Sequence, residues 1–293
     1  MIKKLSKTLD LNERRTKLGK LLKFPQLTVA LLFLTLIFQN CQAPTEGCLD
    51  LRATNFDVTA SKACEKACCT YPALVVAANY KVDTFGFYFD STYVDATNQK
   101  FRIVSAQMYL SNFQLVGANA KVYQTIDSFS LRRATDTINA LNDYALVGKN
   151  VGFNFTIGAF SSTGVAFTKF KFRLGLDDGA TKAIPTKMPT AHPLSIKADS
   201  MYISSKNQYI FTKFVIAKGV DFKEIVRLDI TTPKDIEIVK NLSFTEGSDA
   251  KIPLTINYLN FFKGVDFSKT QQEIQDKVVL NINSNALSIF SIK

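Results

Sequence analysis

The chain has 293 residues, enough to bury a full hydrophobic core, and 46% of them are hydrophobic, with 24 Phe and no Trp. Its formal net charge is +11, but residues 1–40 contribute +6 of that, and the remainder is scattered without a basic stripe. This composition is that of a globular protein and excludes nucleic acid as an expected partner.

A basic stretch followed by an apolar run opens the chain. The apolar run, residues 27–38, has about 12 residues, which is too short for a helix that spans roughly 30 Å of hydrocarbon. A basic stretch before an apolar run of this length is typical of a secretory signal. Residues 1–40 are therefore predicted to be a signal segment, and the protein is predicted to be exported.

Cys41 lies three residues after the apolar run, where the signals of bacterial lipoproteins place the cysteine that is acylated. The residues before it are Phe38, Gln39 and Asn40, whereas the usual signal has Leu followed by two small residues. Ordinary cleavage after Ala43 is the alternative, but a proline follows, and proline at that place normally blocks the peptidase. We predict that Cys41 is lipidated and that the lipid holds the protein to a membrane of the cell envelope, on the periplasmic side or at the cell surface.

The other four cysteines, Cys48, Cys64, Cys68 and Cys69, lie within 22 residues. Acylation of Cys41 accounts for the odd total, and four clustered cysteines in an exported chain predict a disulfide framework. The neighbours Cys68 and Cys69 are poorly placed to bond each other because their Cβ vectors diverge. Two pairings remain, Cys48–Cys68 with Cys64–Cys69, or Cys48–Cys69 with Cys64–Cys68. A zinc ion held by all four cysteines is the alternative, although adjacent cysteines suit one tetrahedral ion poorly.

Residues 41–72 are too few to build a hydrophobic core, so cystines are expected to stabilise this segment. Its stretch GCLDLRATNFD resembles pieces that are common in exported proteins of the Bacteroidetes group. Asp50, Asn55 and Asp57 would offer oxygen ligands to calcium. Asp and Asn at such spacings also cap turns, and turns are the interpretation that we favour.

The body, residues 73–293, repeatedly alternates apolar and polar residues at a period of two, which predicts half-buried strands. The clearest runs are residues 85–89, 153–157, 170–174, 228–230, 236–238 and 254–258, with turn signals between them. Ile274, Val278 and Ile282 recur at a spacing of four and predict a helix. The predicted fold is mainly β: an antiparallel β-sandwich with a short C-terminal helix and a small disulfide-rich N-terminal segment.

Catalytic signatures are mostly absent from the sequence. A single histidine, His192, limits any serine or cysteine nucleophile to one place, and no G-x-S-x-G, glycine-rich phosphate loop or H-E-x-x-H motif occurs. Asp177 and Asp178 adjoin a glycine, so a turn explains them. The chain is predicted not to be an enzyme; the alternative is a glycosidase whose two carboxylates meet only in the fold.

Residues 172–214, FRLGLDDGATKAIPTKMPTAHPLSIKADSMYISSKNQYIFTKF, resemble the most distinctive segment of the MbnP-like family, named for methanobactin-binding periplasmic proteins. Members show a strand ending in Leu-Gly-hydrophobic-Asp, then His-Pro-Leu, then a Met-Tyr-Trp-x-Trp run closing on Gly-Tyr. Residues 108–116 and 259–290 are similar to further pieces of the family. The matching positions are Leu174, Gly175, Leu176, Asp177, His192, Pro193, Leu194, Met201, Tyr202 and Tyr209.

The resemblance implies a periplasmic or surface β-sandwich. It also implies copper binding, because the best-understood members use histidine and an oxidised tryptophan as ligands and work with a dihaem partner. This sequence departs from that pattern at the ligand positions. Ile203 and Ser205 replace the two tryptophans, Gln208 replaces the glycine, and the chain has no Trp at all. The oxidised ligand therefore cannot form.

The candidate metal ligands are His192 and Met188, which would offer copper a soft nitrogen and sulfur pair. Two flanking prolines place them in a loop, and two ligands do not complete a site. Met108 and Met201 lie on apolar runs and are expected in the core. We therefore expect no tightly bound copper.

Two functions follow from these observations. The resemblance implies a non-catalytic binding lipoprotein of the envelope that is related to copper handling. The departures favour a sandwich that has lost the copper site and binds a protein or a glycan without metal. An envelope protein is a candidate partner in both cases.

Overall fold

The computed structural model describes residues 43–293, apart from residues 65–67, 83, 150–151 and 197–200. The predicted signal segment and Cys41 lie outside the described residues. No described helix has both the length and the apolar character that crossing a membrane requires.

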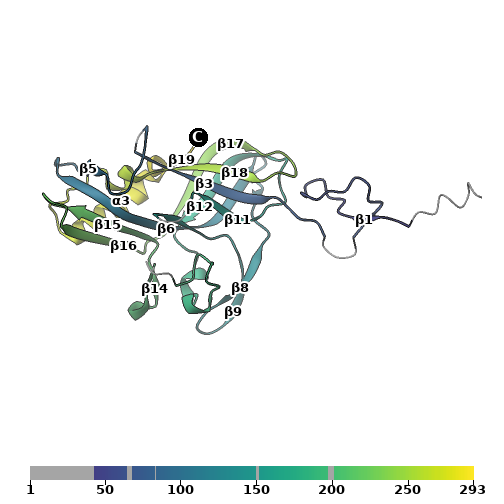
Figure 1. Ribbon diagram of the computed structural model, residues 1–293, viewed down its shortest axis with the longest axis horizontal. Helices are drawn as coiled ribbons and strands as arrows, with labels where there is room; N and C mark the ends of the chain where they lie inside the picture. Colours follow the sequence, from purple (N-terminus) through teal and green to yellow (C-terminus); the bar gives the residue numbers. More distant parts are fainter. Residues whose placement is uncertain (1–42, 65–67, 83, 150–151, 197–200) are drawn as a thin grey trace, which may run out of the picture.

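Two β-sheets form the body (Figure 1). The larger has eight strands, and its main path runs in the order β16 (Glu224–Ile230), β15 (Thr212–Lys218), β6 (Lys100–Gly117), β12 (Ala166–Leu174) and β17 (Lys234–Ser243). Three shorter strands also pair with β6: β5 (Thr92–Val94), β7 (Val122–Tyr123) and β10 (Ala145–Gly148). The second sheet has the order β11 (Asn154–Ala159), β3 (Ala73–Val82), β18 (Ala250–Asn257) and β19 (Phe290–Ile292), with β4 (Phe85–Gly86) beside β3.

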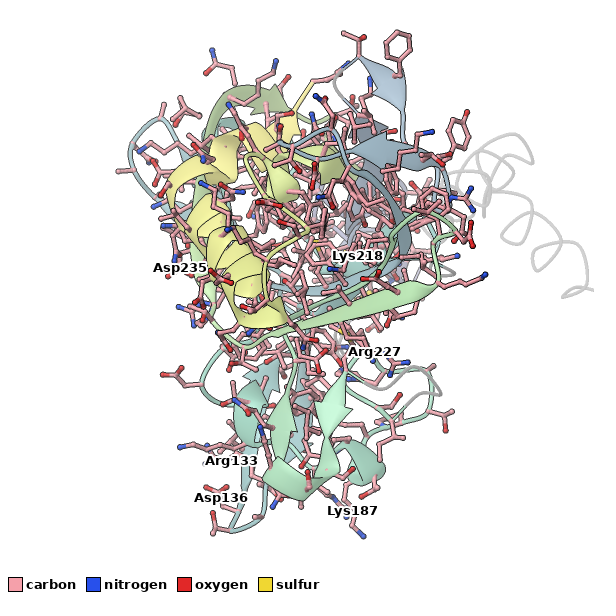
Figure 2. All side chains as sticks on the ribbon, turned by 90° about the vertical axis from the view of Figure 1, so that its left-hand side faces the viewer. Arg133, Asp136, Lys187, Lys218, Arg227 and Asp235 are labelled. Atoms are coloured by element: carbon pink, nitrogen blue, oxygen red, sulfur yellow. A yellow bond between two sulfur atoms is a disulfide. The ribbon has the colours of Figure 1, made fainter. Side chains whose placement is uncertain are left out.

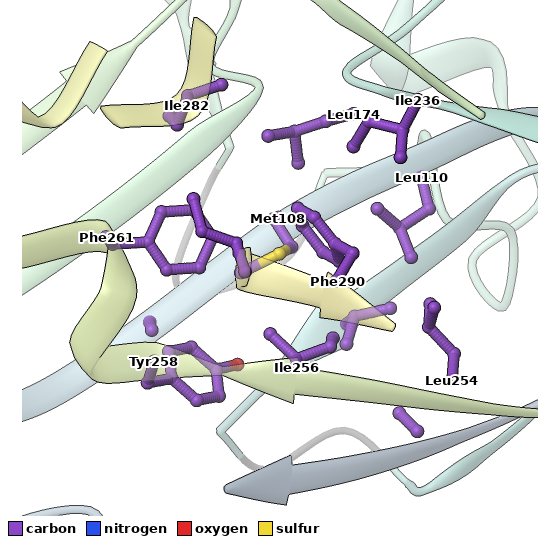
Figure 3. Packing of buried hydrophobic residues seen from close by; sticks show 14 of the residues in the cluster. Met108, Leu110, Leu174, Ile236, Leu254, Ile256, Tyr258, Phe261, Ile282 and Phe290 are labelled. Carbon is purple, nitrogen blue, oxygen red and sulfur yellow. The ribbon is translucent and has the colours of Figure 1, made fainter. Parts of the chain in front are cut away.

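Aromatic side chains fill the space between the two sheets. Along β12 the alternation predicted from the sequence is observed, since Phe170 and Phe172 are fully buried while Lys171 and Arg173 face outward. Figure 3 shows how residues of both sheets and of the C-terminal helix meet in this core, among them Met108, Phe261 and Phe290. The core position expected for Met108 is confirmed, with none of its surface exposed.

The helix α3 (Gln271–Ile289) follows a 3-10 helix, η4 (Tyr258–Phe262), near the C-terminus. It begins with a capping box, in which Thr270 accepts a hydrogen bond from the Glu273 backbone N–H and Glu273 bonds back to the cap. Ile274, Val278 and Ile282, the three residues that predicted it, are buried against the sandwich. The predicted fold class, a mainly β sandwich with a C-terminal helix and N-terminal disulfides, is therefore confirmed.

Strands β3 and β18 pair in parallel, unlike the other described pairs of the two large sheets. Parallel neighbours need a long crossover connection, and here the chain builds the whole of the larger sheet between the two strands. Their inward residues, including Val76, Leu254 and Ile256, are almost completely buried. This pairing depends on contacts between residues far apart in sequence, so the local period of two does not reveal it.

A lobe extends from one side of the sandwich and consists of residues 126–144, 176–196 and 201–211 (Figure 2, lower half, with Arg133 and Lys187). It contains the hairpins β8 (Ser128–Arg132)–β9 (Thr137–Leu141) and β13 (Tyr202–Ile203)–β14 (Gln208–Tyr209). Three 3-10 helices complete it: η1 (Ala180–Lys182), η2 (Pro185–Lys187) and η3 (Ser204–Lys206). Its own hydrophobic cluster is separate from the sandwich core.

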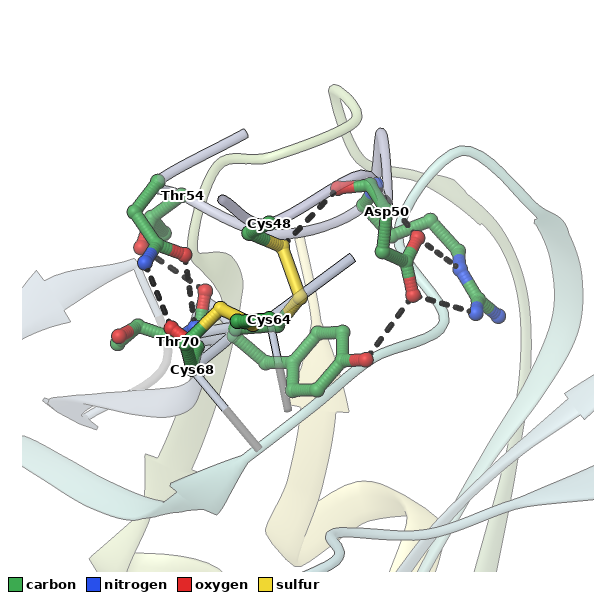
Figure 4. Close-up of a disulfide and its surroundings, with 10 residues drawn as sticks. Cys48, Asp50, Thr54, Cys64, Cys68 and Thr70 are labelled. Atoms are coloured by element: carbon green, nitrogen blue, oxygen red, sulfur yellow. Dashed lines mark hydrogen bonds and ion pairs between the residues drawn. A yellow bond between two sulfur atoms is a disulfide. The ribbon is translucent and has the colours of Figure 1, made fainter. Parts of the chain in front are cut away.

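Residues 43–72, here named the cystine module, lie at one end of the long axis beyond the sandwich (Figure 1). The strands β1 (Glu46–Gly47) and β2 (Lys62–Ala63) form its small sheet. Its disulfides are Cys48–Cys69 and Cys64–Cys68, with Cα–Cα distances of 5.1 and 6.2 Å (Figure 4). This selects the second of the two predicted pairings and uses the cysteines that a zinc site would need.

The three side chains considered above as calcium ligands stabilise turns and neighbouring segments of the cystine module. Asp50 binds the Arg52 guanidinium, which lowers the pKa of the carboxyl, and accepts a hydrogen bond from the Tyr71 hydroxyl at 2.9 Å. Asn55 bridges the backbone of residues 68 and 70, and Asp57 accepts from the Thr59 backbone N–H at 2.8 Å. Within the described residues no cluster of three His, Cys, Asp or Glu offers a metal site.

Candidate functional site

The residues that match the family pattern converge in the lobe. Gly175 directly follows β12 and has a φ of 113°, and a Cβ there would lie 2.8 Å from the Phe211 ring, so glycine suits this position best. The Tyr109 hydroxyl donates to the carbonyl of Pro193 at 3.1 Å, and the Tyr209 hydroxyl donates to that of Leu194 at 2.9 Å. These contacts give the matching residues a structural role: the Tyr109 bond holds the lobe against β6, and the Tyr209 bond joins two parts of the lobe.

Tyr209 is the centre of this packing. Its ring is 2% exposed and makes edge contacts with Tyr202, at a centroid distance of 4.9 Å, and with Tyr109, at 5.9 Å. Burial raises the pKa of Tyr209 above the usual range for tyrosine. Its hydroxyl therefore stays protonated and remains a hydrogen-bond donor at physiological pH.

His192 lies in a turn of the lobe and both of its ring nitrogens have partners. Nδ1 accepts a hydrogen bond from the Leu194 backbone N–H at 3.2 Å, so the proton of the neutral ring is on Nε2. That nitrogen lies 3.0 Å from Oδ1 of Asn142, to which it donates. The imidazole also packs on the Phe129 ring at a centroid distance of 4.7 Å. His192 is thus a packing residue with no free lone pair directed at a ligand.

The methionines of the lobe are part of its apolar cluster. Met188, which follows η2, is 8% exposed, and Met201 is 4% exposed. The core position expected for Met201 is confirmed. At the two positions where the family has tryptophan, Ile203 packs partly buried against the cluster and Ser205 is exposed.

A polar junction between the lobe and the sandwich was not anticipated from the sequence. Asp143 is 3% exposed, and its Oδ2 accepts from the Phe113 backbone N–H at 3.1 Å. This contact lies at an irregularity of β6, where Asn112 has a φ of 54°. Burial raises the pKa of Asp143 to about 7, and the nearby charge of Asp177 adds to this shift. An Asp directly before the buried run of β10 is the sequence signal that could have indicated it.

Asp177, a matching position of the family pattern, closes the same junction. Its Oδ2 accepts from the Tyr144 hydroxyl at 2.6 Å, and its Oδ1 accepts from the backbone N–H groups of Gly179 and Ala180 at 2.8 and 2.9 Å. The predicted turn after β12 is therefore observed and fixed by this carboxylate. Both oxygens of Asp177 accept hydrogen bonds and Asp143 is buried, so contacts within the protein account for this pair of carboxylates.

Two shallow hollows lie elsewhere, at the first residues of β17. One, of about 410 Å³, lies between residues 234–237 and the end of α3 at residues 283–288. The other, of about 260 Å³, is on the outer face of β6, β12 and β17. Glu237 pairs there with Lys169 and Lys171, and Asp235 pairs with Arg173. Because these charges neutralise one another across neighbouring strands, they account for the polar lining without a ligand.

The architecture defines a class of protein: an open β-sandwich that carries a packed lobe and a cystine-stabilised N-terminal module. The family model described as MbnP matches residues 72–279, and the chain therefore belongs to the MbnP family. Among solved structures, the chain is similar to MbnP from Methylosinus trichosporium, at 12% identity and a TM-score of 0.42, over 66% of this chain and 78% of that one. No curated protein matches the chain.

The copper site that the family resemblance implies does not fit the residues present. A tight copper site needs three or four ligands with lone pairs aimed at one point. Here the only histidine uses both nitrogens in hydrogen bonds, two methionines lie in apolar packing, and the tryptophan positions hold Ile203 and Ser205.

Proposed function

We propose that this chain is a lipid-anchored protein of the cell envelope whose MbnP-family domain binds a protein or a glycan without a metal ion and without catalysis. The observation that carries the proposal is the bonding of His192. Its Nδ1 accepts from Leu194 and its Nε2–H donates to Asn142, so a metal could bind only after one of these contacts breaks.

The packing of the lobe supports a binding role rather than an enzymatic one. The side chains that match the family pattern are committed to structure: Tyr209 to the Leu194 carbonyl, and Asp177 to Tyr144 and two backbone N–H groups. A rigid lobe held on a rigid sandwich offers a preformed surface, which lowers the ordering cost of association.

The anchor is supported by the sequence around Cys41 and by the cysteine arithmetic. The two disulfides account for four of the five cysteines, and the fifth, Cys41, stands at the sequence position where lipoprotein signals are acylated. Triacylation would hold the chain firmly, whereas a single acyl chain gives only marginal binding.

Intact mass and metal content of the membrane-extracted protein test the proposal together. We expect a mature chain that begins at an acylated Cys41 and contains no stoichiometric copper. The matched variant Cys41→Ser should leave the membrane fraction or retain its signal segment. A mature chain that begins at Pro44 without lipid would contradict the proposed anchor. Stoichiometric copper would contradict the proposed binding role without metal.

A further inference from the structure

The cystine module presents an unusual apolar loop at the end of the molecule that the predicted anchor would join. We propose that residues 49–58, here named the module loop, rest on the lipid bilayer that holds the anchor. This inference rests on the proposed lipid anchor at Cys41. It adds an orientation of the whole domain, with the cystine module facing the membrane.

Four large hydrophobic side chains of the module loop are exposed to solvent. Val58 is 82% exposed and Leu51 is 61% exposed, followed by Leu49 at 44% and Phe56 at 38%. Single exposed hydrophobic residues are normal on a protein surface, but four within ten consecutive residues of a small module are not. The buried interior of the module is made instead by Cys48, at 2% exposure, and Ala53, at 3%.

The module loop is closed and ordered before it meets any partner. The Asp57 backbone N–H donates to the Cys48 carbonyl at 2.9 Å, and Phe56 forms a bridge with Cys48 across the base of the loop. The Thr54 N–H donates to the Thr70 carbonyl at 2.8 Å. Because the loop is already fixed, contact with a surface requires little loss of conformational entropy.

The polar groups of the module loop are satisfied within the module. Asp50 is paired with Arg52, and Asp57 accepts from Thr59. Groups that already have hydrogen-bond partners lose less when they approach the headgroup region than free ones would. The loop carries little net charge, so its contact depends on apolar burial and the tether and does not require anionic lipid.

The chain between the predicted anchor and the cystine module is short, so the surface nearest to the module loop is the lipid bilayer that holds the anchor. Four residues, 42–45, separate the acylated position from β1, and the five Cα–Cα steps from residue 41 to residue 46 span at most about 18 Å. The Thr45 carbonyl is itself held by the Ser61 backbone N–H at 2.9 Å. The exposed aromatic ring of Phe85 lies beyond the far end of β3, a strand of ten residues or about 33 Å. The module loop is therefore much closer to the anchor than that ring.

A single tryptophan reports on lipid contact without interference, because the chain has none of its own. The mature lipoprotein would carry Val58→Trp or Leu51→Trp, both at exposed positions that tolerate a larger side chain. The matched control is Phe85→Trp, at an exposed aromatic position on the other end of β3. Each variant would be reconstituted into phosphatidylcholine vesicles with and without brominated acyl chains.

We expect the Val58→Trp and Leu51→Trp emission to shift to the blue on reconstitution and to fall at least twofold with brominated lipid. The Phe85→Trp emission should be unchanged. Flotation of the same samples separates the two proposals. Variants that float with the vesicles but show no quenching at Val58→Trp and Leu51→Trp would overturn the lipid contact and leave the anchor intact.

Three other outcomes would also overturn the lipid contact. Quenching at Phe85→Trp alone would place the opposite end of the sandwich on the bilayer. A blue shift at Val58→Trp that grows with protein concentration in the absence of vesicles would assign the module loop to a second copy of the chain. Protein that fails to float would remove the anchor and this inference with it.

Discussion

The sandwich and the lobe are stabilised in different ways. The sandwich buries a large set of aromatic and aliphatic side chains between two sheets, such as Phe113, Phe170 and Phe214, and none of these is exposed. The lobe has a smaller apolar cluster. Asp143 bonds it to β6 of the sandwich, and the bond from Tyr144 to Asp177 joins its two chain segments.

This difference separates what defines the family from what defines a ligand site. The matching residues of the lobe are those that pack it, such as Tyr209 and Gly175, and they are retained here. The positions that would supply a tryptophan ligand, 203 and 205, hold a partly buried Ile and an exposed Ser instead. A lobe can therefore keep its fold after the residues for one particular chemistry have been replaced.

The largest expected effect is a loss of stability in the sandwich core, and a matching variant in the lobe tests whether the two cores unfold independently. Phe214→Ala removes a fully buried ring that contacts Phe261 and Phe262 at centroid distances of 5.1 and 5.0 Å, and it should lower the free energy of unfolding by about 3–5 kcal/mol. Leu194→Ala, at a fully buried position of the lobe, should expose lobe amides to hydrogen exchange while sandwich amides stay protected. Simultaneous loss of protection in both regions for Leu194→Ala would show that they form one cooperative unit.

Reduction of the disulfides extends the comparison to the cystine module. Each disulfide should stabilise the folded form of residues 43–72 by roughly 2–4 kcal/mol. The closed loops are short, so each disulfide removes only a moderate amount of conformational entropy from the unfolded chain. With a mild reductant, hydrogen exchange should increase in this module while the sandwich remains protected. Thiol titration of the oxidised, denatured protein should find no free cysteine among Cys48, Cys64, Cys68 and Cys69, and four reactive thiols would contradict the framework.

The Asp143 carboxyl predicts a pH dependence at the junction of lobe and sandwich. Its pKa of about 7 in the folded protein lies above the ordinary value of 3.8, so the folded state binds more protons at this site between those pH values. The site therefore loses stabilising free energy as pH rises from about 4 to about 7. The substitution Asp143→Asn replaces the carboxyl with an amide that does not titrate, so it removes this pH-dependent part of the unfolding free energy.

We compare the unfolding free energy of Asp143→Asn with that of the unmodified chain. This difference should increase in favour of the variant by at most a few kcal/mol between pH 4.5 and pH 8. Urea unfolding at both pH values measures it. The control Asp178→Asn changes an exposed carboxyl two residues before η1 and should show little difference. A flat profile for Asp143→Asn would mean that Asp143 titrates normally in the folded protein.

A smaller effect is expected from one hydrogen bond of the same junction. Tyr144→Phe removes the hydroxyl that donates to Asp177 at 2.6 Å and should cost about 1.5 kcal/mol, because the acceptor is a carboxylate. Tyr88→Phe, on a ring that is 70% exposed, should change the unfolding free energy by less than about 0.5 kcal/mol. Equal values for the two variants would argue against the role given to the junction.

The strands and the helix could be predicted because their signals are local. Phe170 and Phe172 alternate with charged residues, and Ile274 and Val278 recur at helical spacing, so burial follows directly from periodicity. The order of strands and the parallel pairing of β3 with β18 depend on long-range packing that no local pattern records. The cysteine pairing stayed open for a related reason, since both pairings satisfy the same spacing.

The junction was missed because its members are dispersed along the chain. Asn142, Asp143 and Tyr144 meet Asp177 and His192 only after β8–β9 and the 176–211 segment fold beside each other. The sequence did indicate that Asp177 lies in a turn and that His192 with Met188 does not complete a metal site. It could not indicate that Asn142 occupies the remaining nitrogen of His192, which is the contact that argues most directly against a metal.

Copper binding to the purified protein tests the central claim most directly. After incubation with one equivalent of copper and exhaustive dialysis, we predict substoichiometric metal by elemental analysis, together with no absorption from a modified residue. Any residual weak affinity should disappear in His192→Ala. Stoichiometric copper that survives dialysis and persists in His192→Ala would contradict the account and would require a ligand set assembled from other residues of the fold.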